Sequence, residues 1–177
     1  MTQYTYGLTR LIGHGHAFSE VVAVASPAVA TGFTYTASGL QWQMLDLVSF
    51  RLVSDGNAAN RQVTLTITDG GGIALATLPS ASVQVATKTY DYTWSTEFDT
   101  FNAVVSNAIT SPLPAVFLQP GYSVVVAVGS VQAGDQISRI RLYAEQFVTG
   151  PQGYLLGVVD ERLPHYADRA ARRQKGA

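Results

Sequence analysis

The chain contains no cysteine in its 177 residues. Disulfide bonds, thiolate nucleophiles and zinc sites built on cysteine are therefore excluded. Charge is also scarce, because Asp, Glu, Lys and Arg together make up 13% of the residues, about half of the roughly 25% that soluble domains carry. A surface with so few charges must be hydrated by Thr, Ser, Gln and Asn, and it suits packing against neighbouring proteins.

The chain also lacks a strong field of either sign, since its formal net charge is −1. A net charge this small would not attract the chain to nucleic acid or to a membrane surface, and we expect neither as a partner. The apolar run 21–30 is too short to span a bilayer and is interrupted by Ser26 and Pro27. The first 17 residues include Arg10, His14 and His16 and do not resemble a signal peptide, which predicts synthesis in the cytoplasm.

What the chain does contain is a series of strand patterns separated by Gly, Asp, Asn and Pro turns, without a convincing amphipathic helix. The segment 98–109 is ambiguous between helix and strand. The valine-rich segment 122–128 is typical of a central strand buried on both faces. We expect strands at 17–25, 32–37, 41–53, 61–68, 73–78, 81–95, 113–118, 122–128 and 137–147, and an extended segment at 152–159.

Three segments carry particular detail. Residues 61–68 alternate apolar and polar side chains, and the run Asp69 to Gly72 that follows is a strong hairpin signal. In 41–53, Trp42, Met44, Val48, Phe50 and Leu52 share one face of a continuous strand, but Asp46 interrupts that face and predicts a bulge or a rim position. In 137–147, the alternation places Arg139, Arg141 and Glu145 on the solvent side.

About eight strands in a chain of this length predict one all-β domain. We expect a jelly-roll-like β-sandwich at 17–150, with an extended N-terminal arm at 1–16 and a C-terminal arm at 151–177. An immunoglobulin-like topology is the alternative, although its characteristic cysteines are absent. Residues 168–177 carry four basic side chains and one acid, which gives a small basic end of +3 on a body of −4.

The sequence offers little for catalysis. The pair His14 and His16 is too small a ligand set for zinc, and His165 is isolated. There is no G-x-S-x-G elbow, and the acids Asp91, Glu97, Asp99 and Asp135 show no spacing that singles out a catalytic pair. We therefore expect a protein that is not an enzyme and has no catalytic residue, metal or cofactor.

Aromatic residues gather between positions 90 and 101. Tyr90, Tyr92 and Trp94 share one face of a predicted strand, and Phe98 and Phe101 follow. Such a face suits a hydrophobic core or an interface. It also suits stacking on sugar rings, so a carbohydrate-binding or host-adhesion module is the alternative function.

Two stretches resemble structural proteins of tailed bacteriophages. Residues 46–68 read D-L-V-S-F-R-L-V-S-D-G-N-A-A-N-R-Q-V-T-L-T-I-T and are followed by D-G-G-G. In those proteins a strand ending in R-L-V-x-D leads through an A-N-R turn into a second strand and a D-G-x-G hairpin. The segment L-Q-P-G-Y-S-V-V-V at 118–126, with G-D-Q-I at 134–137, is similar to the last strand pair of their jelly rolls. The resemblance covers roughly residues 40–147.

The resemblance implies a non-enzymatic virion protein, associated with the head as a decoration or cement subunit, or with the neck or collar. Its partners would then be further copies of itself and other virion proteins, such as the major capsid or portal and neck proteins. The alternative above would place a sugar-binding module on a phage tail or fibre. The terminal arms are expected to contribute the assembly contacts through Tyr4, Tyr6, Arg169, Arg172, Arg173 and Lys175.

Overall fold

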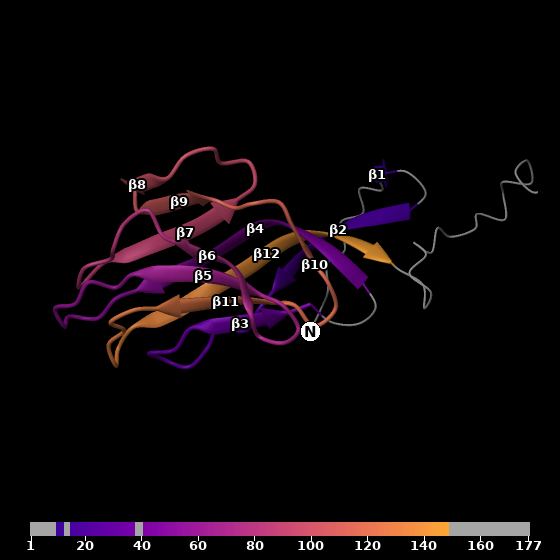
Figure 1. Ribbon diagram of the computed structural model, residues 1–177. Coiled ribbons are helices and arrows are strands. Elements are labelled where there is room, and N and C mark those ends of the chain that lie inside the picture. Colours follow the sequence, from indigo (N-terminus) through magenta and orange to yellow (C-terminus); the bar gives the residue numbers. More distant parts are fainter. Residues whose placement is uncertain (1–9, 13–14, 38–40, 149–177) are drawn as a thin grey trace, which may run out of the picture.

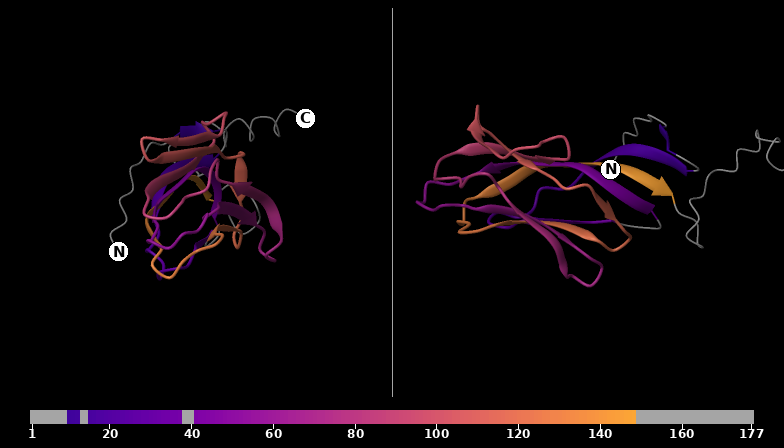
Figure 2. Two further views of the ribbon diagram at one scale, coloured as in Figure 1. Left: turned by 90° about the vertical axis from the view of Figure 1, so that its left-hand side faces the viewer. Right: turned by 45° about the horizontal axis from the view of Figure 1, so that its top comes forward.

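The computed structural model describes residues 10–12, 15–37 and 41–148, and these form twelve strands and no helix. The strands make two sheets that lie face to face as a β-sandwich (Figures 1 and 2). The predicted all-β class and the sandwich are thus confirmed. The predicted arms lie mostly outside the described residues, but Arg10–Ile12 forms a short strand and Gly15 begins the next one.

The larger sheet has eight strands in the order β1-β2-β12-β4-β7-β9-β8, and β10 pairs with the first part of β4. All neighbours are antiparallel except β7 and β9, which are parallel. Its strands are β1 (Arg10–Ile12), β2 (Gly15–Ala23), β4 (Gln41–Val53), β7 (Thr89–Ser95), β8 (Asn102–Val105), β9 (Ala108–Pro112), β10 (Val116–Leu118) and β12 (Gln136–Val148).

The smaller sheet has four antiparallel strands in the order β3-β11-β5-β6. They are β3 (Phe33–Thr36), β5 (Val63–Thr68), β6 (Ala74–Pro79) and β11 (Ser123–Val128). The predicted hairpin between β5 and β6 is confirmed: the carboxylate of Asp69 accepts hydrogen bonds from the backbone N–H groups of Gly71 and Ile73, both at 2.8 Å. Gly72 completes the turn with a φ of 83°, a conformation that glycine adopts without strain.

The core lies between the two sheets and is built around stacked aromatic rings. The ring of Phe50 on β4 stacks on Tyr92 and Trp94 of β7, with centroid distances of 5.3 and 5.9 Å. Phe33 of the smaller sheet meets the Phe50 ring edge-on at 5.5 Å. Aromatic rings in such offset and edge-to-face contacts bury large areas and fix the spacing of the two layers. The predicted core use of Tyr92 and Trp94 is confirmed.

Two segments differ from their expected form. Residues 81–88 are not the first half of a long strand; β7 begins only at Thr89, and Thr87 has a φ of 58°, which an extended strand does not allow. The ambiguous segment 98–109 contains strand β8 and the start of β9. These strands are joined at Ser106 and Asn107, both with positive φ, as in the tight turns that match the twist of a β-hairpin.

Strand β11 is central in its sheet, as expected, but it is buried on one face only. Val124 and Val126 are fully buried between the layers, whereas Val125 is partly exposed and Ala127 is exposed. The prediction of burial on both faces was wrong, because each sheet of a two-layer sandwich has one face covered by the other sheet and one face exposed to solvent. A valine run alone does not distinguish that position from the middle of a three-layer fold.

Candidate functional site

The side of the larger sheet that faces away from the core, on strands β2, β4, β7, β10 and β12, carries exposed charged and apolar side chains. We call it the outer face. On β4 the side chains of Val48, Phe50 and Leu52 point into the core, so Ser49 and Arg51 point outward. The strand register then aligns Ser49 with Arg141 of β12 and Arg51 with Asp91 of β7.

A bulge at Asp46 changes the side to which the first part of β4 points. Leu47 pairs with Tyr143 of β12, but Leu45 pairs with the next residue, Ala144, so Asp46 is the extra residue. Of the two alternatives predicted at Asp46, a bulge or a rim position, the structure shows the bulge. Its consequence is that Trp42 and Met44 lie on the outer face rather than with Val48, Phe50 and Leu52, because one extra residue reverses the alternation.

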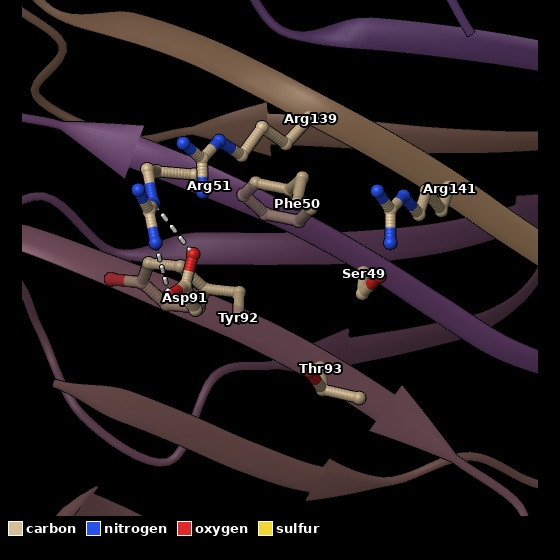
Figure 3. A pocket seen from close by; sticks show the side chains of 8 residues that line it. All are labelled: Ser49, Phe50, Arg51, Asp91, Tyr92, Thr93, Arg139 and Arg141. Atoms are coloured by element: carbon tan, nitrogen blue, oxygen red, sulfur yellow. Dashed lines mark hydrogen bonds and ion pairs between the residues drawn. The ribbon is translucent and has the colours of Figure 1, made fainter. Parts of the chain in front are cut away.

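At one end of the outer face, three arginines line an open groove of about 240 Å³ (Figure 3). Arg51 forms a bidentate ion pair with Asp91, with N–O distances of 2.8 and 2.7 Å. The hydrogen bonds from Arg51 lower the pKa of Asp91; burial of the carboxylate opposes this effect, and the charges of Arg51 and Arg139 add to it. Ser49, Phe50, Tyr92, Thr93 and Arg141 complete the lining.

The other two arginines have no hydrogen bond or ion pair within the part of the chain that the structure describes. Arg139 and Arg141 are both exposed, which confirms their predicted place on the solvent side. Arg139 has a φ of 55° at a second bulge, where the register of β12 against β4 shifts. With three arginines and one aspartate, the groove has a formal charge of +2. Free guanidinium groups of this kind bind carboxylate or phosphate oxygens.

Further along the same face the charge is negative. Glu145 of β12 pairs with Met44, and its side chain points outward beside the bulge at Asp46. Burial, and then the nearby charges of Glu145 and Glu97, raise the pKa of Asp46 above its ordinary value. One carboxylate oxygen of Glu145, Oε2, is buried and has no hydrogen-bond partner. Within the residues whose side chains the structure describes, neither Asp46 nor Glu145 forms an ion pair.

Apolar side chains lie between and beside these charged groups. Tyr143 of β12 is 37% exposed and Val21 of β2, its partner in the ladder, is 45% exposed. Trp42 and Phe117 are also exposed, and the pairing of Phe117 with Met44 places it on the same face. Exposed apolar side chains gathered on one sheet face indicate a contact surface for another protein.

A second polar cluster, at one end of the sandwich, is buried and holds loops together. The fully buried guanidinium of Arg61 donates to Asp135 at 2.8 Å and to Asp55 at 2.7 Å. It also donates to the carbonyl oxygens of Asn57 and Ala59, both at 3.1 Å. We call Arg61, Asp55 and Asp135 the buried ion network. It joins the loops that follow β4 and β11, and it offers no group to an external ligand.

The residues proposed from the sequence fall into two groups. Tyr4, Tyr6, Arg169, Arg172, Arg173 and Lys175, like His14 and residues 152–159, lie outside the described residues. Of the proposed sugar-stacking residues, Tyr92 and Trp94 are buried in the core and Tyr90 is half-buried against it. The rings of Tyr92 and Trp94 present no free face to a sugar, because the opposite sheet covers the inner side of β7.

The outer face contains residues that the sequence reasoning did not connect. Arg139, Arg141 and Glu145 were expected on the solvent side, but Arg51, Asp46 and Trp42 were not expected beside them. The signal for β12 is its alternation, Arg141, Tyr143 and Glu145 at every second position. The neighbours on β4 depend on the register and on the bulge, which no local pattern specifies.

In the residues that the structure describes, no group of three or more His, Asp or Glu side chains is placed to hold a metal ion. The same residues include no helix long and apolar enough to cross a membrane. Neither the protein-family models nor the curated proteins include a match to this chain.

Proposed function

We propose that this protein is a non-enzymatic structural subunit of a tailed-bacteriophage virion, head-associated as a decoration or cement protein or as a neck or collar protein. In this proposal its sandwich is a jelly roll that assembles with further copies and with other virion proteins, such as the major capsid or portal proteins. The observation that carries the proposal is the strand order of the two sheets.

The proposed jelly roll is supported by the order of eight of the twelve described strands. One layer has the order β2-β12-β4-β7 and faces a second layer with the order β3-β11-β5-β6. Along the chain these strands alternate between the layers, except for the hairpin from β5 to β6. Strands β8, β9 and β10 form an insertion between β7 and β11. Viral capsid subunits use this two-layer arrangement, as do lectins and cupins.

The buried ion network adds support from the motifs that carry the phage resemblance. Asp55 and Arg61 belong to the first resembling stretch, and Gly134 and Asp135 belong to the second. The backbone N–H of Asp55 donates to Asp135 at 2.9 Å, and the N–H of Gly134 donates to Asp55 at 3.2 Å. The two stretches thus form one structural unit, which is consistent with a resemblance that concerns a shared scaffold rather than a catalytic site.

The outer face supports assembly rather than a solitary role. Its exposed side chains include Val21, Trp42, Phe117 and Tyr143. Its charged groups Arg139, Arg141 and Glu145 form no ion pair within the described residues. A subunit of a symmetric shell or ring would cover such a face with a neighbour.

The test is the presence of the chain in purified phage particles. Particles from a lysate that expresses the gene would be separated on a density gradient and analysed by quantitative mass spectrometry. We expect the chain to sediment with the major capsid protein in a fixed ratio that resists washing with high salt. A chain found only in the soluble fraction of the lysate, at any salt concentration, would refute the proposal.

A further inference from the structure

The charges on the outer face are arranged so that they would complement those of a second copy of the same face. Every second residue of β12 from Arg141 to Glu145 lies on the outer face, in the order Arg141, Tyr143, Glu145. The pairing of β12 with β2 is regular and uninterrupted from Arg141 to Phe147. Alternate residues of a strand lie about 7 Å apart on one face. A cation and an anion therefore lie at equal distances on either side of Tyr143.

The neighbouring strand β4 extends the apolar row and the acidic end. Leu47 lies beside Tyr143, and Asp46 lies beside Glu145. Arg51, at the other end of the strand, is already paired with Asp91, so the cations of that end without an ion pair among the described residues are Arg139 and Arg141. The outer face thus changes from basic to acidic across one apolar row, which Val21 extends on β2.

We propose that two copies pack outer face against outer face around a two-fold axis that runs across the strands at the Tyr143–Leu47 row. This inference rests on the proposed function, because it names the first partner of an assembling subunit. Under that symmetry Tyr143 meets Tyr143 of the partner subunit, and Arg141 lies against Glu145 of the partner subunit. A two-fold interface repeats each contact, so two such ion pairs form.

The observations favour a second copy over other occupants. A nucleic acid or another polyanion would suit Arg139 and Arg141 but would be repelled by Asp46 and Glu145 on the same face. A uniformly basic partner would be attracted by the two acids but repelled by the two arginines. A second copy presents both signs at the required spacing, and it covers the exposed Tyr143 and Val21 at the centre of the contact.

The experiment uses charge reversal in the full-length chain, with the molar mass measured by sedimentation velocity over a range of concentrations. The wild type is expected to form dimers. In R141E, the new glutamate faces Glu145 of the partner subunit, and in E145R the new arginine faces Arg141 of the partner subunit. The two-fold axis repeats this repulsion, so each variant should raise the dimer dissociation constant by about a hundredfold or more. An equimolar mixture of the two variants should recover dimers, because both contacts then pair opposite charges again. The matched control K88E reverses an exposed charge away from the groove and should leave the mass unchanged.

A second measurement does not depend on the folding of these charge variants. Because the chain has no cysteine, a single Tyr143→Cys substitution places one thiol per copy beside the proposed axis. Mild oxidation should then form disulfide-linked dimers much faster than it does for Ile73→Cys, because Ile73 is 68% exposed in the hairpin turn of the other sheet, away from the proposed axis.

A wild type that stays monomeric, an R141E variant with the wild-type mass, or equal cross-linking of the two cysteine variants would overturn this interface. If the chain is nevertheless found in the particles at a fixed ratio, the proposed function stands and only the two-fold contact is rejected. If dimers form as expected but the chain is absent from particles, the contact stands and the virion role is rejected.

Discussion

Replacement of Arg61 by methionine tests whether burial, rather than ion-pair geometry, decides how much an arginine–aspartate pair contributes to this fold. Arg61→Met keeps most of the apolar volume of the side chain but removes four hydrogen bonds from a guanidinium that is 0% exposed. Its partner Asp135 is also 0% exposed and would be left as a buried, uncompensated charge. Loss of one partner from a buried pair lowers the free energy of unfolding by about 3–5 kcal/mol.

The chain contains its own control. Arg51 and Asp91 form a pair of nearly equal length, 2.7 Å against the 2.8 Å between Arg61 and Asp135, but their side chains are 28% and 48% exposed. Water can solvate the remaining carboxylate in Arg51→Met, so this variant should lose far less stability than Arg61→Met. If distance decided the contribution, the two substitutions would have equal effects.

The assay is urea unfolding followed by far-ultraviolet circular dichroism, with the slope of the transition checked for equality among the variants. A loss of less than about 1 kcal/mol in Arg61→Met, or equal losses in the two variants, would refute the reasoning. The double variant Arg61→Met/Asp135→Asn should recover part of the loss, because it removes the carboxylate that the single variant leaves without a cation.

Two further predictions concern a close backbone contact and acid stability. A Cβ on Gly32 would overlap the carbonyl oxygen of Val126, so Gly32→Ala should lower the free energy of unfolding by about 3 kcal/mol, whereas Gly56→Ala, with no atom within 4 Å, should stay within about 0.5 kcal/mol in the same urea assay. Burial would raise the pKa of Asp135, but hydrogen bonds from Arg61 and from backbone N–H groups outweigh it and hold the pKa below its ordinary value. The stability from this ionised group is present above the unfolded-state pKa of about 3.9 and is lost as the pH falls through the lower folded-state pKa. The melting temperature would be measured from about pH 6 to about pH 2, the range in which carboxylates titrate. It should fall more steeply with falling pH for the wild type than for Asp135→Asn. Parallel curves for the two proteins would contradict this.

Local patterns predicted most of the strands. The bounds of β4 agree with the expected 41–53, and Asp69 and Gly72 form the turn that their residue types favour. A bulge or a rim position at Asp46 was also predicted, since a charge within an apolar alternation is costly unless the backbone shifts around it. These features depend on side-chain period and turn chemistry, which short stretches of sequence contain.

Other features depend on what each segment meets in the folded chain. Residues 81–88 carry an alternating pattern but form a loop, in which the amide of Gln84 donates to the carbonyl oxygens of Leu52 and Lys88. Its carboxamide oxygen also accepts a hydrogen bond from the hydroxyl of Tyr92. A buried glutamine of this kind satisfies distant backbone groups, and no local pattern reveals that need.

The candidate site shows the same division. The alternation along β12 is sufficient to place Arg141 and Glu145 on the solvent side. Their relation to Asp46 and Arg51 depends on the register between β12 and β4 and on the bulges that shift it. The burial of Tyr92 and Trp94 was not evident from the sequence, because a strand pattern does not show which face of β7 the second sheet covers.

Composition and local pattern were sufficient to predict an all-β chain with few charges and no cysteine, a tight hairpin at Asp69, and the placement of Arg141 and Glu145 on the solvent side of one strand. These properties depend on residue types and on the two-residue period of a strand. Other features arise only in the folded chain: Asp55 and Asp135, 80 residues apart, share the guanidinium of Arg61, and a single face carries a basic end, an apolar row and an acidic end. They could not be predicted locally, because strand pairing joins residues that are distant in the chain, and a shift of one residue moves a side chain from the core to the surface.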